Sequence, residues 1–394
     1  RLSQGAAAFV AACQALGFPS HRDINDGGPI EGVSPIQMNV RGGRRVSTAR
    51  AYLRAARRRP NLRVLTGVRA ERVLVEDGRA VGVAARRDGG AGEGQVFRAR
   101  REVVLCAGAV ATPKLLLLSG IGDGDDLAAL GIPAVVHLPG VGKNLQDHLI
   151  ARLSFRTKPA GTLNEIMASR LRLARTALGY ALRRNGPLAI GATEATLFAR
   201  VTPGAEEAEA QFQFINFSLS TAGYVLQPHP GMMINFGQCR PDSRGVLALR
   251  SPDPDDKPVI RANYLEAPGD RRVMVGAARL GRRIGRTPPF SGLVEEETLP
   301  PPCADDEEAL LEHIRRTGTT VYHPCGTCRM GSSSDPMAVV DHQCKVIGLE
   351  SLRVADSSIM PQVTNGNLNA PTLMIGEKAS DHILGKDPLP PSNQ

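Results

Sequence analysis

Small and apolar residues recur at helical spacing at the start of the chain. Residues 3–17 (SQGAAAFVAACQALG) form an alanine-rich run behind a serine, and Gly17 ends it, so we expect a helix there. The same reasoning predicts a helix over residues 47–60. The pattern then changes to alternation, and Asp77 and Gly78 between two alternating runs predict a β-hairpin.

A buried strand followed by small residues lies at 101–109 (REVVLCAGA), and the run after it (TPKLLLLSG, 112–120) predicts a helix. Small residues at such a strand–turn–helix junction let a ligand approach the backbone at the helix N-terminus. The glycine-rich stretch at 89–94 (GGAGEG) has the wrong spacing for a G-x-G-x-x-G fingerprint, and we interpret it as a turn between strands. The sequence contains no such fingerprint elsewhere.

The middle of the chain alternates between helical and strand patterns. This mixture is typical of an α+β unit with an antiparallel sheet. Near the C-terminus, SLRVADSSIM (351–360) predicts another buried strand, and APTLMIGEKASDHIL (370–384) predicts a helix. In the middle part we expect helices at 165–184, 268–286 and 305–317, and strands at 194–201, 209–217 and 245–251.

Composition narrows the class of protein. With 394 residues, 42% hydrophobic and 22% charged, the chain is long enough for two domains and has the balance of an ordinary globular protein. The net charge of +9 raises the question of nucleic acid. However, the arginines are scattered, aromatic residues make up 4%, and tryptophan is absent, so we expect no nucleic-acid partner. No apolar run is long enough to span a membrane.

Seven cysteines, an odd and widely spread set, indicate a reducing compartment, and we expect a cytoplasmic protein. Cys325 and Cys328 have the C-x-x-C spacing of a thiol redox pair or of half a zinc site. A zinc site needs two more ligands, and the nearby His342 and Cys344 do not complete a recognisable pattern. We therefore expect no metal, and we favour packing over redox chemistry for the C-x-x-C.

Five blocks of the sequence resemble one family, the glucose–methanol–choline (GMC) flavin oxidoreductases, and they occur in the family's order. The likeness covers nearly the whole chain and is greatest to the bacterial choline dehydrogenase-like alcohol dehydrogenases. The blocks are GAVATPKLLLLSGIG, LPGVGKNLQDH, RPDSRGVLALRSPDP, YHPCGTCRMG and LRVADSSIMPQVTNGNLNAPTLMIGEKASD.

The resemblance implies a fold class of α/β plus α+β, with a Rossmann-like FAD-binding domain and an antiparallel-sheet substrate domain. It divides the chain into residues 1–150 (FAD-binding domain with linking loops), 151–340 (substrate domain), 341–388 (the return to the FAD domain, with the catalytic loop) and a tail at 389–394. Family members begin with a strand and a G-x-G-x-x-G turn that this sequence lacks, so we expect a truncated chain with an incomplete FAD-binding domain.

The implied reaction is FAD-dependent oxidation of an alcohol to an aldehyde or ketone, with hydride passing from the carbinol carbon to flavin N5. His323 lies in YHPCGT and Asn367 follows 44 positions later, which resembles the family's catalytic pair. A histidine suits removal of the hydroxyl proton because its ordinary pKa lies near neutrality. We therefore expect His323 to be the general base and Asn367 to hold the alcohol oxygen near the flavin.

The resemblance also implies contacts with FAD and with the substrate. Asp356 is one of the implied FAD contacts, and its alternative role is that of a helix cap or an ion-pair partner.

We expect a small-molecule alcohol as substrate and a quinone or oxygen as electron acceptor. We leave open a homodimer and association with a membrane surface. An oxidase, a lyase of this fold and an inactive FAD-free fragment are the alternatives. The implied FAD contacts are Ala70, Gly108, Asp356, Ser357, Asn367 and Leu368, and the implied substrate contacts are Glu194 and Gln213.

Overall fold

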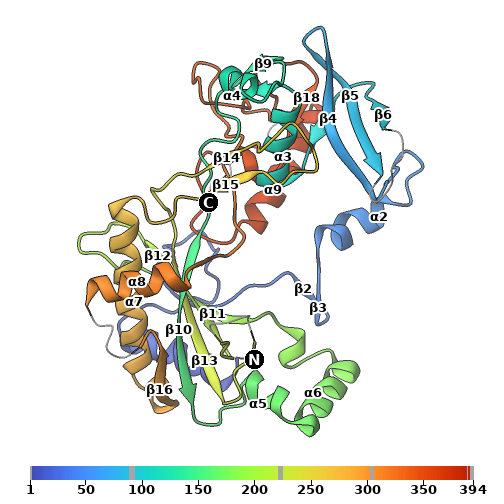
Figure 1. Ribbon diagram of the computed structural model, residues 1–394. Coiled ribbons are helices and arrows are strands. Elements are labelled where there is room, and N and C mark those ends of the chain that lie inside the picture. Colours follow the sequence, from blue (N-terminus) through green and yellow to red (C-terminus); the bar gives the residue numbers. More distant parts are fainter. Residues whose placement is uncertain (1, 88–93, 221–224, 302–305, 388, 391–394) are drawn as a thin grey trace. The chain divides into compact units, whose positions relative to one another are not determined.

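The computed structural model describes residues 2–87, 94–220, 225–301, 306–387 and 389–390, which form two compact units (Figure 1). The glycine-rich turn expected at 89–94 falls almost wholly outside the described residues. Each unit is assembled from three separate stretches of the chain. Unit 1 consists of Arg1–Val64, Leu149–Cys239 and Pro268–Val321, and unit 2 of Leu65–His148, Arg240–Ala267 and Tyr322–Gln394.

Unit 1 contains a seven-stranded sheet in which neighbouring strands pair antiparallel. Strand β12 alternates over most of its length: Phe212 and Phe214 are buried, and Gln211 and Gln213 are half-buried. Such alternation is typical of a sheet with one covered face. The order is β1 (Gly32–Pro35), β11 (Thr193–Ala199), β12 (Ala210–Ile215), β13 (Gly231–Gln238), β10 (Leu149–Thr157) and β16 (Val294–Leu299), with β17 (Thr319–Thr320) also paired to β10.

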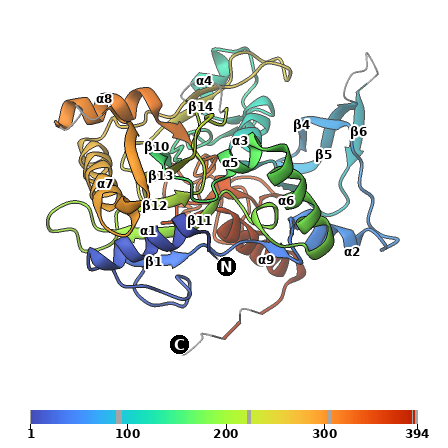
Figure 2. The same cartoon turned by 90° about the horizontal axis from the view of Figure 1, so that it is seen from below.

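Helices α1 (Gln4–Ala15) and α7 (Pro268–Arg286) pack on this sheet and on each other (Figure 2). The hydroxyl of Ser3 caps α1 by accepting from a main-chain N–H, as expected for a serine before an apolar run. The remaining helical segments of unit 1 are η1 (Ala49–Leu53), α2 (Arg54–Ala56), α5 (Leu163–Ala168), α6 (Arg170–Arg183), η2 (Pro187–Ala189), η3 (Phe290–Gly292) and α8 (Glu307–Thr317), beside the hairpin of β2 (Val40–Arg41) and β3 (Arg44–Arg45).

Four phenylalanines form the centre of the core in unit 1. Phe290 is fully buried, and its ring meets Phe155 edge-on at 5.8 Å between centroids and Phe214 at 6.0 Å. Phe9 of α1 adds a third contact to Phe290 at 6.4 Å. Edge-to-face pairs are a favourable arrangement of aromatic rings, so Phe290 joins helix α1 to strands β10 and β12.

Unit 2 is built around a pair of parallel strands, β7 (Val103–Leu105) and β18 (Leu352–Val354). The hairpin predicted at Asp77 and Gly78 is confirmed, and both residues have the positive φ of a two-residue hairpin turn, 47° and 74°. The other elements are β4 (Val68–Glu76), β5 (Arg79–Arg87), β6 (Gln95–Arg98), α3 (Gly108–Leu118), β8 (Ile121–Gly122), α4 (Gly124–Ala128), β9 (Val136–His137), β14 (Val246–Ala248), β15 (Val259–Arg261), η4 (Ser357–Ile359) and α9 (Asn369–Leu384).

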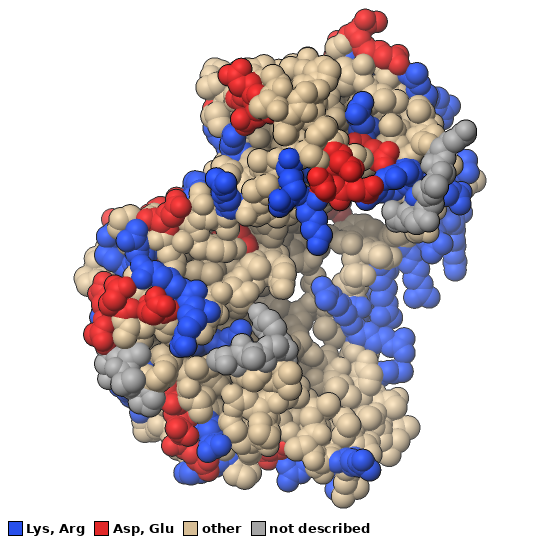
Figure 3. Space-filling model, viewed as in Figure 1, with Lys and Arg blue, Asp and Glu red and all other residues tan. Residues whose placement is uncertain are grey.

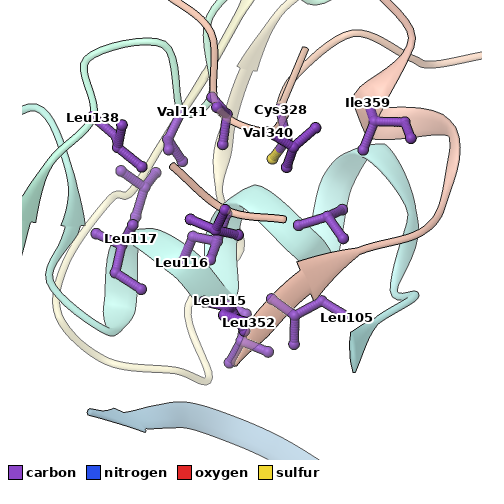
Figure 4. Packing of buried hydrophobic residues seen from close by; sticks show 14 of the residues in the cluster. Leu105, Leu115, Leu116, Leu117, Leu138, Val141, Cys328, Val340, Leu352 and Ile359 are labelled. Carbon is purple, nitrogen blue, oxygen red and sulfur yellow. The ribbon is translucent and has the colours of Figure 1, made fainter. Parts of the chain in front are cut away.

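The core of unit 2 gathers apolar residues from segments that are far apart in the sequence (Figure 4). Leu116 of α3 is fully buried, and Leu105 of β7 and Leu352 of β18 lie in the same cluster. Cys325 and Cys328 also belong to this core, and neither side chain has any exposed surface. The C-x-x-C therefore packs among aliphatic residues, as the sequence predicted.

Two strand assignments need correction. The run at 245–251 was expected in the antiparallel sheet of the middle part, but its strand, β14, pairs with β15 in unit 2. Strands β10 and β13 were not predicted, although they pair along seven residues in the sheet of unit 1. Strand β13 (GMMINFGQ) is almost wholly buried, so it lacks the polar alternation by which a half-exposed strand is recognised.

Replacing Phe290 with alanine should lower the free energy of unfolding of unit 1 by about 3–5 kcal/mol, because it empties the space between three other rings. Guanidinium titration followed by circular dichroism measures this change. Phe97→Ala, at a half-exposed position of unit 2 (38% exposed), is the matched control and should cost far less. A loss below about 1 kcal/mol for Phe290→Ala would show that the ring cluster does not hold unit 1 together.

Candidate functional site

The site begins where strand β7 ends and helix α3 starts. Gly108, the first residue of α3, has a φ of 81°, and a Cβ placed on it would meet no atom within 4 Å. The carboxyl ends of parallel strands meet at one edge, so Asp356, just after β18, lies beside it. The main-chain N–H of Gly108 donates to Asp356 Oδ2 at 2.9 Å. Asp356 thus holds the backbone of Gly108 in place, and the side of Gly108 where a Cβ would lie is open.

Asp356 is buried and accepts hydrogen bonds on both carboxylate oxygens. Oδ2 also accepts from the Thr112 hydroxyl at 2.6 Å, and Oδ1 accepts from the main-chain N–H of Ser358 at 2.8 Å. Asp356 therefore ties the start of α3 to the start of η4, which is the capping role that the sequence left open. Its contact with FAD stays a prediction.

Segment 357–359 holds segment 324–330 by backbone hydrogen bonds. The N–H of Gly326 donates to the carbonyl of Ser357 at 3.2 Å, and that of Cys328 donates to the carbonyl of Ser358 at 2.8 Å. The Ser357 hydroxyl donates to the carbonyl of Pro324 at 3.1 Å. Through these contacts the predicted FAD residues are linked to the segment that follows His323.

His323 and Asn367, the pair that the family resemblance implies, lie in contact. The amide Nδ2 of Asn367 is 3.3 Å from Nε2 of His323. Asn367 is exposed, and Leu368 behind it is buried at the start of α9. The amide is thus held at the surface of unit 2 by a buried neighbour and faces one ring nitrogen of the histidine.

Three further residues belong to this site and were not singled out from the sequence. Nδ1 of His148 lies 2.9 Å from Nδ1 of His323, with the two rings nearly perpendicular at 82°. Oδ1 of Asp147 accepts from the main-chain N–H groups of both His148 and His323, each at 2.9 Å. Oδ2 of Asp147 accepts from the hydroxyl of Tyr264. The available signal was the block LPGVGKNLQDH, which was recognised as a whole without roles for its last two residues.

The environment of His323 keeps its imidazole neutral. Burial, and after it the neighbouring His148, lower the pKa of His323 to about 4, although the Asp147 carboxylate acts in the opposite direction. At neutral pH the ring therefore has one N–H and one free lone pair. A neutral imidazole is the form of histidine that can accept a proton.

The remaining predicted residues lie elsewhere. Ala70 is in strand β4 of unit 2, paired with Ala85. Glu194 and Gln213 belong to unit 1, on the neighbouring strands β11 and β12. Glu194 is buried and accepts from the main-chain N–H of Ser3 at 2.8 Å. The structure thus gathers six of the predicted residues in one network or next to it in unit 2: Gly108, Asp356, Ser357, His323, Asn367 and Leu368.

The thiols do not have the properties of a redox or metal centre. Burial raises the pKa of Cys325 to about 12 and also raises that of Cys328, so both stay protonated at neutral pH. The cysteines of the described part of the chain are free of disulfides. Within the same part, no group of three or more His, Cys, Asp or Glu side chains is arranged to hold a metal ion.

The surface has charges of both signs. On the face in Figure 3, basic side chains occur as separate groups with acidic groups among them. Several of the arginines are paired, for example Arg86 with Glu71 at 2.9 Å and Arg98 with Glu76 at 2.6 Å. Helices long and apolar enough to cross a membrane are not found among the residues that the structure describes.

Comparison with known sequences identifies relatives over the whole chain. Residues 2–150 and 241–376 match two family models, both described as GMC oxidoreductase. Over 388 residues the chain is 41% identical to an oxygen-dependent choline dehydrogenase of Rhizobium johnstonii. The match covers 98% of this chain and 69% of that relative.

Solved structures agree with this assignment. Pyridoxine 4-oxidase from Mesorbium loti superposes with a TM-score of 0.85 at 31% identity, over 98% of this chain and 71% of that one. Formate oxidase of Aspergillus oryzae, a structure concerned with FAD modification, superposes with a TM-score of 0.88 at 25% identity, over 96% of this chain and 69% of that one. The resemblance of the five blocks and the predicted fold class are confirmed, and the chain belongs to the GMC oxidoreductase family of FAD-dependent enzymes.

Proposed function

We propose that this protein uses FAD to oxidise a small-molecule alcohol to an aldehyde or ketone, with His323 as the general base. The observation that carries the proposal is the contact between a neutral imidazole and a side-chain amide, Nε2 of His323 to Nδ2 of Asn367 at 3.3 Å. A base and a hydrogen-bond donor are the two groups needed at the hydroxyl of an alcohol while hydride leaves its carbon.

The protein's own part of the reaction concerns the hydroxyl group. Nε2 of neutral His323 accepts the hydroxyl proton, and the amide of Asn367 donates a hydrogen bond to the oxygen as negative charge develops on it. The low pKa of His323 means that the base is ready at neutral pH without prior loss of a proton. FAD, when bound, would supply the acceptor for the hydride that leaves the carbinol carbon.

The residues of unit 2 fit FAD at the junction of β7 and α3. The space beside Gly108 is open, so a flat or polar group can approach the backbone there, as a dinucleotide does at a strand–helix turn. Gly108, Asp356, Ser357, Asn367 and Leu368 would line this part of the FAD site. Ala70, through its main chain, would contact the adenine.

The names of the relatives support oxygen as the electron acceptor. The curated relative is an oxygen-dependent choline dehydrogenase, and one structural neighbour is an oxidase of pyridoxine. We therefore propose oxygen as the acceptor, and a quinone is the alternative that the family resemblance implies. For the substrate, buried Glu194 on β11 favours a cationic alcohol, and the neutral amide of Gln213 on β12 does not add to that preference.

Compartment and assembly are part of the same proposal. Free cysteines throughout the described residues support a reducing cytoplasm, and association with a membrane surface is the alternative for an enzyme that reduces a quinone. A homodimer is the assembly that the sequence left open, and light scattering of the purified protein tests it.

Replacing His323 with alanine should lower the rate of flavin reduction by alcohol about 10²–10⁴-fold, because the hydroxyl proton loses its acceptor. Anaerobic stopped-flow absorbance measures this rate. His342→Ala, at an exposed position of the same unit, is the matched control and should leave the rate unchanged. Equal rates for His323→Ala and the unsubstituted protein would remove His323 from the mechanism.

Replacing Gly108 with alanine should reduce the amount of FAD that copurifies with the protein, because the added methyl group fills the open side of the backbone. Gly131→Ala is the matched control, since Gly131 also has positive φ (68° against 81°) and open space at its Cβ. Both variants share the cost of a strained backbone, about 1 kcal/mol. The flavin-to-protein absorbance ratio should fall only for Gly108→Ala, and an equal ratio for both would contradict this placement of FAD.

A further inference from the structure

We propose that His148 is a positioning residue that fixes the proton of His323 on Nδ1 and so leaves Nε2 free to act as the base. The inference rests on the proposed function, because it assigns the base to His323. It concerns two side chains of unit 2 that come from the end of LPGVGKNLQDH and from YHPCGT.

The two histidines meet in a defined geometry. His148 is buried, with 4% of its surface exposed, and its Nδ1 lies 2.9 Å from Nδ1 of His323. The rings are edge-to-face, with centroids 5.2 Å apart. At this distance one Nδ1 donates and the other accepts, so the two tautomers are coupled.

The contact on the other side of His323 decides which nitrogen donates. A side-chain amide nitrogen can only donate, and Nδ2 of Asn367 faces Nε2 of His323. Nε2 is therefore the acceptor. Because the ring is neutral, its single proton is on Nδ1 and is donated to Nδ1 of His148. His148 in turn has its own proton on Nε2.

Asp147 binds the backbone of both His148 and His323 and so holds the two residues next to each other. One carboxylate oxygen accepts the main-chain N–H groups of His148 and His323 together, and the hydroxyl of Tyr264 donates to the other oxygen. These backbone hydrogen bonds fix the distance between His148 and His323 and leave the two imidazole rings in contact through their Nδ1 atoms. A carboxylate placed directly on Nδ1 would favour the imidazolium, whereas His148 is an acceptor that can remain neutral.

The consequence for the reaction is a choice between two tautomers. With the proton on Nδ1, the lone pair of Nε2 faces the amide of Asn367, where the alcohol oxygen is proposed to bind. With the proton on Nε2, the same ring would present an N–H group and could not accept the hydroxyl proton. In serine proteases, where a carboxylate holds the catalytic histidine, the wrong tautomer lowers the rate about 10⁴-fold.

The direct test observes the tautomer itself and does not need FAD. Protein labelled with ¹⁵N-histidine is measured by long-range ¹H–¹⁵N correlation, and His323 is assigned by its absence in His323→Gln. The unsubstituted protein should show His323 protonated on Nδ1. His148→Leu, which offers no acceptor, should shift His323 toward the Nε2–H form. In His148→Asn the amide oxygen can replace Nδ1 as acceptor, and the Nδ1–H form should return. An unchanged tautomer in His148→Leu would overturn the proposal.

The kinetic test separates this proposal from the proposed function. His148→Leu should lower the rate of flavin reduction by about 10²–10⁴-fold with little change in KM, and His148→Asn should recover most of the loss. His342→Leu, at an exposed position, is the control and should not change the rate. If the tautomer shifts in His148→Leu and the rate stays the same, positioning by His148 is supported and His323 as the base is wrong. Equal rate losses in His148→Leu and His148→Asn, with the tautomer retained in both, contradict positioning by His148.

Discussion

The parallel pairing of β7 with β18 brings together residues 248 positions apart, as the hydrogen bond from Gly108 to Asp356 shows. Because both strands run in the same direction, the residues after each of them meet at one edge. Asp356 links the start of α3 to η4, and η4 in turn holds the backbone after His323. The site of unit 2 is thus a consequence of one short strand pairing.

Burial has opposite chemical effects on the two kinds of side chain in the stretch YHPCGTCRMG. It lowers the pKa of His323 and so maintains a neutral base, whereas it raises the pKa of Cys325 and Cys328 and so keeps both thiols inactive. The cysteines are therefore part of the core, although their spacing is the more conspicuous feature of the sequence. His323 faces the polar side chains of His148 and Asn367.

Local patterns predicted the helices of this protein well, because their signals are local. Ser3 capping α1 and the Asp77-Gly78 turn each lie within a few residues of the element that they define. Strand β13 was missed because it is almost wholly buried, and β14 was placed in the wrong sheet because strand partners are set by distant parts of the chain. Strand β10 does alternate, with Ile150 and Arg152 half-buried and Arg156 exposed, and was missed despite that signal.

The candidate site was predicted only in part, because most of its contacts join distant parts of the chain. The pairing of His323 with Asn367 came from a resemblance in spacing, and the two side chains do lie in contact. His148 and Asp147 contact His323 from 175 and 176 positions away, and Tyr264 contacts Asp147 from 117 positions away. Sequence patterns contain no local signal for such contacts. The domain boundaries at 150, 340 and 388 stay predictions.

The central claim is that a neutral, half-buried His323 removes the proton of an alcohol whose hydride reduces FAD. Its most direct test is the rate of anaerobic bleaching of the flavin by an alcohol, such as choline or pyridoxine, measured from pH 4 to pH 8. Since protonation removes the base and the pKa of His323 is lowered to about 4, the rate should stay level from pH 8 to about pH 5 and fall only toward pH 4. A lyase or an FAD-free protein would show no bleaching, and a decline centred near the ordinary histidine pKa of about 6.5 would contradict the account.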